Sequence, residues 1–320
     1  MDSNQITIII PCYNEEKNIE LLFEKIKDNL KNITDFEFNY LFIDDGSSDN
    51  TFQVIEKLAN KYNNIQAIQL SRNFGSHIAI SAGVENVKQS NSLIVISADL
   101  QEPPDIIIRL IKKWLEGYEV VWTIREKRSQ SFMGKIFSNM FHKLFLKASN
   151  FNNYPKEGPS ASFLLDKKVY LNWKKFRESN RMIFGMIAWM GFKHTYIKYL
   201  QNSRMSGKSS YTFFKLIKLA IDSFVSFSFA PIRIISYIGI IISILSFVYA
   251  SFLIFEKFYF DVIITGWTSL MVIILILGGV QLITLGIIGE YVWRGVEESR
   301  NRPLYLISKK INFEEDTENK

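Results

Sequence analysis

The sequence predicts an α/β protein: a Rossmann-like domain with a mostly parallel sheet, followed by interfacial helices and two transmembrane helices. Short β-branched runs alternate with amphipathic stretches up to about residue 124. Two longer runs, 232–255 and 267–289, contain almost no charge. The 320 residues therefore divide into an α/β domain at 1–205, a juxtamembrane amphipathic helix at 206–231, a transmembrane hairpin at 232–290 and a C-terminal tail at 291–320.

Each unit of the α/β domain joins an apolar run of strand length to a helical stripe of apolar residues. The expected strands are 6–10, 40–43, 65–70, 93–96, 120–124 and 163–165. The expected helices cover 21–30, 54–58, 77–87, 106–114 and 182–189. Strands that alternate with helices at this spacing are typical of a parallel sheet with helices on both faces.

Polar side chains follow the predicted strands at the points where they end. Because the carboxyl ends of parallel strands lie at one edge of the sheet, we expect convergence there of Tyr13, Glu15, Asp44, Asp45, Asn73 and Asp99. The chain has no G-x-G-x-x-G or Walker motif, which disfavours a dinucleotide oxidoreductase or a nucleoside triphosphatase. Carboxylates in place of glycines favour a nucleotide whose base or ribose is hydrogen-bonded and whose diphosphate is bound through a metal.

The segment 94–104 carries the strongest prediction of a site. Its apolar run ends in Asp99 and Gln101, whose oxygens could both bind one hard divalent cation. A cation with few protein ligands usually completes its shell with phosphate, so the segment indicates a nucleoside diphosphate. The alternative is an aspartate that caps the end of a strand before the helix that begins at Pro103 and Pro104.

Cationic side chains follow at two further places. Arg125 ends a predicted strand, with Lys127 and Arg128 behind it, and this loop suits either a bound phosphate or a solvated turn. Residues 204–211 carry two cations, three serines and a glycine. Such a loop either closes over a phosphate-bearing substrate or caps the helix that begins near Thr212.

The apolar stretches predict contact with a membrane. Each long run exceeds the roughly 20 residues that a helix needs to cross a bilayer, and a pair of buried helices is the alternative. Residues 132–145 place aromatic side chains on one face, which indicates an interfacial helix or an ordinary core helix. More Lys and Arg flank the spans than lie between them, and no signal peptide precedes them, so both termini should be cytoplasmic. The tail beyond Lys309 is polar and expected to be disordered.

Composition excludes several classes of protein. The formal net charge of +6 fits attraction to anionic lipid head groups rather than to nucleic acid, because no nucleic-acid-binding motif occurs. Cys12 is the only cysteine. A single cysteine excludes an intrachain disulfide and a cysteine-based metal cluster, and it fits a reducing compartment.

Five motifs together resemble glycosyltransferase family 2 in their order and spacing. They are Pro11-Cys12-Tyr13-Asn14-Glu15-Glu16, Asp44-Asp45-Gly46-Ser47, Asn73-Phe74-Gly75, Ala98-Asp99-Leu100-Gln101-Glu102-Pro103-Pro104 and Arg204-x-x-Gly207. The two apolar runs and the segments 289–291 and 301–305 look like the polyprenyl-phosphate glycosyltransferases of that family. The resemblance covers nearly the whole chain, to about Tyr305.

This resemblance implies a GT-A catalytic domain that transfers a sugar, with inversion, from a nucleotide donor to a polyprenyl phosphate. The reaction would take place at the cytoplasmic face of a bacterial inner membrane and serve the modification of cell-envelope glycans. UDP-glucose is the expected donor, undecaprenyl phosphate the expected acceptor, and Mg²⁺ or Mn²⁺ the expected metal. A second copy of the chain and a flippase are the further partners, and nucleic acid is not one.

The resemblance also assigns residues by position. Asp99 and Gln101 would bind the metal, and the catalytic set would be Asp99, Gln101, Arg125 and Arg204. The nucleotide sugar and its metal would be held by Pro11, Tyr13, Glu15, Asp44, Asp45, Ser97, Ala98, Asp99, Arg125, Arg204 and Lys208. The chain departs from the family where Ser97 replaces the first Asp of an Asp-x-Asp-x-Gln motif and Ser210 replaces a Lys. Lys208 could supply the cation that Ser210 lacks.

Two alternative functions stay open beside this one. A non-catalytic membrane scaffold would explain Ser97 as a lost metal ligand. A processive polysaccharide synthase of the same superfamily is disfavoured, because the chain has no Gln-x-x-Arg-Trp acceptor motif and two spans are few for a polymer channel. Restoring a carboxylate at position 97 would discriminate a weakened site from an intact one.

Overall fold

The computed structural model describes residues 4–126, 155, 158–178, 181–201, individual positions between 237 and 259, and 266–313. Contacts divide the chain into two compact units, one of residues 1–213 and 302–320 and the other of residues 214–301. Several predicted features lie outside the described residues, namely the helix at 132–145, the juxtamembrane helix at 206–231, Arg204, Lys208 and Ser210.

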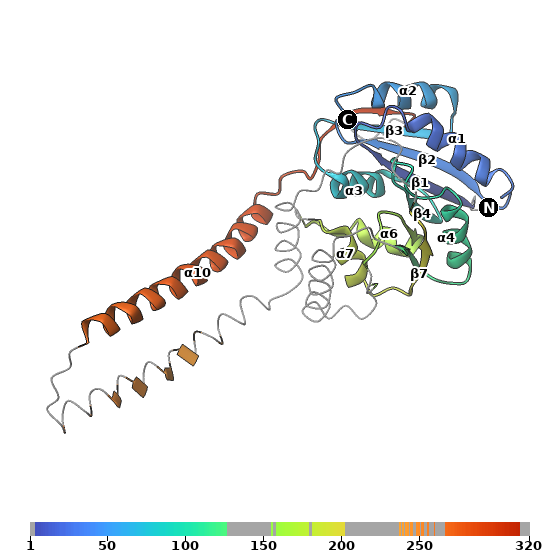
Figure 1. Ribbon diagram of the computed structural model, residues 1–320. Coiled ribbons are helices and arrows are strands. Elements are labelled where there is room, and N and C mark those ends of the chain that lie inside the picture. Colours follow the sequence, from blue (N-terminus) through green and yellow to red (C-terminus); the bar gives the residue numbers. More distant parts are fainter. Residues whose placement is uncertain are drawn as a thin grey trace. The chain divides into compact units, whose positions relative to one another are not determined.

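The first unit contains an eight-stranded sheet in the order β7-β5-β6-β4-β1-β2-β3-β8 (Figure 1). The strands are β1 Gln5–Cys12, β2 Glu37–Asp44, β3 Ile65–Leu70, β4 Ser92–Val95, β5 Val120–Arg125, β6 Phe163–Asp166, β7 His194–Tyr199 and β8 Ile307–Ile311. Four of the seven pairings are parallel: β1 with β2, β1 with β4, β2 with β3, and β5 with β7. The predicted mostly parallel sheet is therefore confirmed, and among the described strands β6 and β8 run against the other six.

The helices of this unit are α1 Ile19–Leu30, α2 Thr51–Lys61, α3 Ser76–Asn86, α4 Ile106–Leu115, α6 Lys167–Trp173 and α7 Ile183–Trp189. Every strand and helix predicted within these ranges is present, although their ends differ by a few residues. The pattern does not predict α6, β7 or β8. Helix α6 has seven residues, and its start is set by the Asp166 carboxylate, which accepts a hydrogen bond from the Lys168 N–H.

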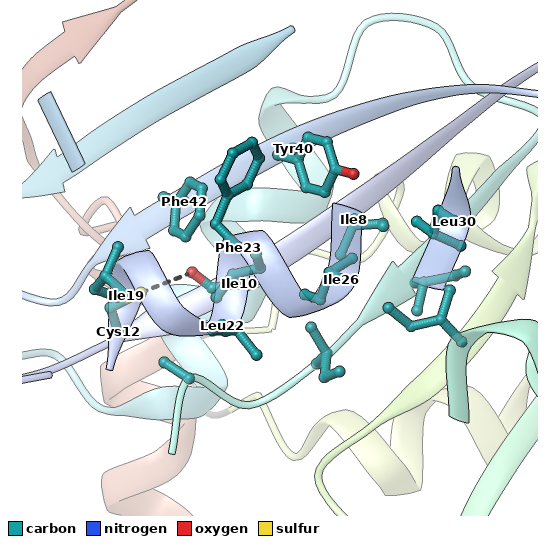
Figure 2. Packing of buried hydrophobic residues seen from close by; sticks show 14 of the residues in the cluster. Ile8, Ile10, Cys12, Ile19, Leu22, Phe23, Ile26, Leu30, Tyr40 and Phe42 are labelled. Atoms are coloured by element: carbon teal, nitrogen blue, oxygen red, sulfur yellow. Dashed lines mark hydrogen bonds between the residues drawn. The ribbon is translucent and has the colours of Figure 1, made fainter. Parts of the chain in front are cut away.

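Alternate residues of the strands face two separate helical layers, because successive side chains of a strand point to opposite faces. Ile8 and Ile10 of β1 belong to the main hydrophobic core with α1, α2 and α4, and Figure 2 shows them against the buried side of α1. Ile9 of β1 and Ile43 of β2 face α3 instead. There Gly83 packs so closely that an added Cβ would lie 2.5 Å from Ile9 Cγ2. Apolar side chains on both faces explain the near-continuous hydrophobic runs of these strands.

The C-terminal residues return to the sheet of the first unit. Strand β8 pairs antiparallel with β3, and Asn312 Nδ2 donates to the carbonyl groups of Ala59 and Ile65 at 2.8 and 2.9 Å. The predicted disorder beyond Lys309 is therefore wrong for Lys310 to Asn312. The three middle residues of β8 are exposed, so this edge strand has the local sequence of a polar tail. It is ordered by its pairing with β3 and by long-range contacts such as that of Ile311 with the core.

The second unit contains helix α10, Trp267–Ser299, which has 33 residues and a length of about 50 Å. Within the described residues, one stretch is long and apolar enough to cross a membrane, Ile276–Ser299, with a mean hydropathy of 1.5. Helix α10 covers the predicted span 267–289 and continues beyond it. Most of the predicted span 232–255 lies outside the described residues, so the number of two spans stays a prediction.

Candidate functional site

The polar residues singled out in the sequence lie at the carboxyl edge of the sheet. Strands β1, β2, β3, β4, β5 and β7 run in one direction, so the residues that follow them gather at this edge. Strand β6 runs in the opposite direction and therefore brings the residues that precede it, including Ser160 and Ser162, to the same edge. These segments form the candidate site.

The loops after β1 and β2 are joined by hydrogen bonds. Asn14 has a positive φ of 56°, a conformation that asparagine tolerates well, and its N–H donates to Ser47 Oγ at 2.9 Å. The N–H of Glu15 donates to Thr51 Oγ1 at 2.8 Å. The side chain of Tyr13 is 45% exposed at the outer rim of these loops. The two loops therefore act as one surface that presents an aromatic ring to solvent.

Asp44 is fully buried and holds its own turn. Its Oδ1 accepts from the N–H of Ser47 at 3.1 Å and from the hydroxyl of that residue. Its Oδ2 accepts from Gln69 Nε2 at 3.1 Å on the neighbouring strand. Both carboxylate oxygens thus stabilise the turn after β2 and its contact with β3.

Asp45 connects the loop after β2 to the loop after β3. Its two oxygens accept hydrogen bonds from the N–H groups of Phe74 and Gly75 at 2.7 and 2.8 Å. Burial raises the pKa of Asp45, and the two backbone donors oppose that shift because they stabilise the carboxylate. Gly75 has a φ of 97°, which favours glycine, and it lies directly before α3. Asp45 therefore sets the position of the start of α3.

Asp99 and Gln101 lie in a tight turn after β4. The N–H of Gln101 donates to Asp99 Oδ1 at 3.1 Å, and the intervening Leu100 has a φ of 57°. Gln201, which follows β7, donates from Nε2 to Gln101 Oε1 at 2.6 Å. The aspartate thus caps this turn, as the alternative interpretation expects, but the helix that follows begins at Ile106 and not at Pro103.

The same two residues fit a cation that is bound together with phosphate. Within the described residues, no three His, Cys, Asp or Glu side chains gather into a metal cluster. Asp99 and Gln101 contribute carboxylate and amide oxygens, and an oxygen that accepts one hydrogen bond keeps a second lone pair. Mg²⁺ and similar hard cations commonly use one or two protein oxygens and complete their shell with water and substrate phosphates. Capping the turn and binding a metal are therefore compatible.

Glu102 is buried and accepts hydrogen bonds from three hydroxyl groups. It is 4% exposed, and its Oε1 lies 3.0 Å from Ser160 Oγ and 2.9 Å from Tyr199 Oη, while Ser162 donates to Oε2. Burial raises the pKa of Glu102, and the three hydroxyl groups oppose the shift. The sequence indicates none of these roles, although Glu102 stands directly after the predicted metal ligand Gln101.

Arg125 belongs to the same group of side chains. Its Nε lies 3.2 Å from Ser160 Oγ and 3.3 Å from Tyr199 Oη. The register of β5 and β7 places Arg125 opposite Tyr199. Burial, together with the nearby Glu102, raises the pKa of Tyr199 to about 12, so its hydroxyl stays neutral. A permanently charged guanidinium therefore stands beside a neutral, buried hydroxyl pair.

The predicted site residues fall into four groups at this edge, one of which is the turn of Asp99 and Gln101 with Gln201. Tyr13 and Glu15 belong to the joined loops after β1 and β2, Asp45 to the start of α3, and Arg125 to the hydroxyl groups around Glu102. Pro11 and Ser97 are partly exposed and Ala98 is buried. The residues that the sequence pattern does not indicate are Glu102, Ser160, Ser162, Tyr199 and Gln201.

Comparison with known proteins gives matches over most of the chain. Residues 7–177 match the family model described as Glycosyl transferase family 2. The uncharacterized glycosyltransferase YkcC of Bacillus subtilis is 37% identical over 97% of this chain and 95% of its own. The prophage bactoprenol glucosyl transferase homolog of Escherichia coli is 32% identical over 95% of this chain and 99% of its own. Among solved structures, a mannosyltransferase of Pyrobaculum calidifontis in complex with GDP-Man and Mn²⁺ is 16% identical, covers 64% of this chain and 58% of its own, and has a TM-score of 0.45.

Proposed function

The chain belongs to glycosyl transferase family 2, and from this premise we propose that it transfers glucose, with inversion, from UDP-glucose to undecaprenyl phosphate. The observation that supports the acceptor and the sugar is the match to the relative named bactoprenol glucosyl transferase homolog. A match over 95% of this chain includes both the sheet domain, with its GT-A fold, and helix α10. The conserved length of the two chains favours the same reaction over a scaffold role.

The nucleophile in this reaction is a phosphate oxygen of the lipid. It forms a bond to the anomeric carbon while the bond from that carbon to the donor diphosphate breaks, so UDP leaves and the configuration inverts. An ionised phosphate needs no general base. The site is consistent with this chemistry, because the hydroxyl groups of Ser160, Ser162 and Tyr199 already occupy the oxygens of the buried Glu102.

The difficulty of the reaction is to bring two anions together and to stabilise the departing diphosphate. Arg125 would bind the diphosphate, with Arg204 and Lys208 supplying further positive charge from the following part of the chain. Asp99 and Gln101 would hold Mg²⁺ or Mn²⁺, and the ion would neutralise charge on the leaving group. The turn after β4 orients these two oxygens before the donor binds.

The nucleoside would lie on the loops after β1 and β2. Pro11, Tyr13 and Glu15 would contact it directly, and the exposed ring of Tyr13 suits a base or ribose. The Asp44–Asp45 pair supports this surface through its internal hydrogen bonds. Ser97 and Ala98 would line the side nearest the metal.

The acceptor explains the apolar part of the chain. Helix α10 exposes large apolar side chains within its unit, for example Leu282 at 72%, Ile283 at 64% and Leu285 at 63%. These three side chains do not share one face of the helix. A helix that is apolar all round suits a bilayer, where its backbone groups are satisfied internally. We place α10 and residues 232–255 in a bacterial cytoplasmic membrane as a hairpin with both termini on the cytoplasmic side. This anchoring raises the encounter rate with a substrate confined to the bilayer.

Release of nucleoside diphosphate by the purified full-length protein in detergent tests the proposal. The assay uses UDP-glucose, UDP-galactose, UDP-N-acetylglucosamine and GDP-mannose, with and without undecaprenyl phosphate, and with Mn²⁺, Mg²⁺ or a chelator. We expect release that requires the lipid, a divalent cation and UDP-glucose. Donor binding without release from any sugar nucleotide would instead support a non-catalytic scaffold.

The substitution Ser97→Asp separates a weakened site from a complete one. We expect turnover to stay within about threefold of wild type, because one or two protein oxygens suffice when phosphate completes the shell of the cation. The comparison of kcat at saturating Mn²⁺ measures this. A gain of more than about 30-fold, or about 2 kcal/mol of barrier, would mean that the native chain lacks a ligand its metal site needs.

A further inference from the structure

Two buried hydroxyl groups lie between Glu102 and Arg125. Ser160 Oγ is 3.0 Å from Glu102 Oε1 and 3.2 Å from Arg125 Nε. Tyr199 Oη is 2.9 Å from the same carboxylate oxygen and 3.3 Å from the same nitrogen. The two hydroxyl oxygens are 2.6 Å apart, and their residues are only 4% and 2% exposed. Arg125 therefore contacts the carboxylate through hydroxyls that solvent hardly reaches.

A count of hydrogens fixes the direction of these contacts. Each hydroxyl has one hydrogen, and the triangle of Glu102 Oε1, Ser160 Oγ and Tyr199 Oη uses both. Toward Arg125 each hydroxyl consequently presents a lone pair, which accepts from the Nε–H group. The second oxygen of Glu102 accepts from Ser162 and so anchors the carboxylate.

Strands hold two members of this arrangement, Arg125 and Tyr199, and a backbone hydrogen bond ties a third to β5. Arg125 and Tyr199 are partners in the parallel register of β5 and β7, and the N–H of Ser160 donates to the Thr123 carbonyl at 2.7 Å, two residues before the arginine. Sites built on strands hold their geometry better than sites built on loops. Because the guanidinium group is planar, a fixed Nε–H restricts the plane in which its two terminal NH₂ groups lie.

We infer that Glu102 is a positioning residue, which orients the guanidinium group of Arg125 through the hydroxyl groups of Ser160 and Tyr199. The inference rests on the proposed function, in which Arg125 binds the donor diphosphate. An arginine recognises phosphate best when both terminal nitrogens meet two oxygens in one plane. The hydroxyl pair sets that plane before the nucleotide arrives, so less side-chain entropy is lost on binding.

Binding of UDP to the full-length protein in detergent with Mn²⁺, measured by titration calorimetry, tests this relay. We expect Tyr199→Phe and Glu102→Gln each to weaken binding about tenfold, the worth of one hydrogen bond to a charged group. In an Arg125→Ala background, Tyr199→Phe should have no further effect, because the hydroxyl acts through the arginine. Ser160→Ala removes the other hydroxyl and gives the same test if Tyr199→Phe does not fold.

Tyr170→Phe is the matched control. Tyr170 is fully buried and donates to the Ser90 carbonyl at 2.7 Å, and Ser90 precedes β4, at the edge of the sheet opposite to the site. We expect it to lower the melting temperature and leave the Kd for UDP within twofold. The relay would be overturned if Tyr199→Phe left the Kd unchanged, or weakened binding equally with and without Arg125. Failure of the wild-type protein to bind UDP is a different result, and it would overturn the proposed function.

Discussion

The two halves of the candidate site each contain a buried carboxylate, Asp45 and Glu102, and these two are satisfied in different ways. In the half formed by the loops after β1, β2 and β3, Asp45 accepts from the backbone N–H groups of Phe74 and Gly75. In the half at β4 to β7, Glu102 accepts from side-chain hydroxyl groups. Asp45, which is bound to backbone donors, fixes the course of the loop before α3. Glu102, which is bound to side-chain hydroxyl groups, lies beside Arg125 and bears on where charge is placed.

The largest expected loss of stability comes from removing the Asp45 carboxylate in the first half. Asp45→Ala leaves two backbone N–H groups without their acceptor, at a cost of about 3 kcal/mol in the free energy of unfolding. Thermal unfolding of the full-length protein in detergent, followed by tryptophan fluorescence, measures this loss. The exposed Asp35→Ala variant is the control and should change stability by less than about 0.5 kcal/mol. Equal stability of the two variants would contradict a structural role for the carboxylate.

The next effect, in the second half, is a loss of activity without a loss of stability. Asp99→Asn removes a charged metal ligand, and we expect kcat/KM for UDP-glucose to fall about 100-fold while the melting temperature stays within about 2 °C. Nucleoside diphosphate release and thermal unfolding, measured side by side, check both parts. Asp105→Asn, at an exposed aspartate before α4, is the matched control and should keep full activity. Loss of stability without loss of turnover would place Asp99 with the structural carboxylates.

A smaller loss of stability is expected from adding a side chain at Gly46, in the loop after β2. Gly46 has a φ of 66°, and an added Cβ would lie 2.8 Å from the backbone nitrogen of Asn73. We expect Gly46→Ala to cost about 2 kcal/mol, because both the backbone conformation and the neighbouring loop must change. Gly117→Ala is the control: its φ of 89° is also positive, but nothing lies within 4 Å. If the two variants lose equal stability, the loops after β2 and β3 do not constrain each other.

A further effect, which depends on pH, comes from groups outside both halves. Burial lowers the pKa of His77 and of His194 to about 4. The unfolded chain therefore binds more protons than the folded chain between about pH 6.5 and 4, so their contribution is complete above pH 6.5 and is lost as pH falls through 4. Melting temperatures from pH 7.5 to 4.5 should show this decline, and His194→Gln should reduce it. A variant curve parallel to that of wild type would contradict the assignment.

The sequence by itself determined the features that depend on local pattern. Apolar runs of strand length and helical stripes marked β1 to β6 with most of their helices, since burial on both faces of a sheet leaves a signature in consecutive residues. The same logic placed Asp99, Gln101 and Arg125 at the edge where parallel strands end. Length and lack of charge marked α10 as a candidate membrane span.

Only the tertiary structure decided which partners these residues have. Strand β8 has exposed central residues, and it pairs with the edge of β3 and packs Ile311 against the core. Glu102 meets Ser160 and Tyr199 across 58 and 97 residues of chain because β6 inserts antiparallel between β4 and β5 and β7 pairs with β5. Asp45 likewise points to a loop 29 residues away. Contacts of this kind arise from strand order and register, which long-range pairing sets and local sequence does not encode.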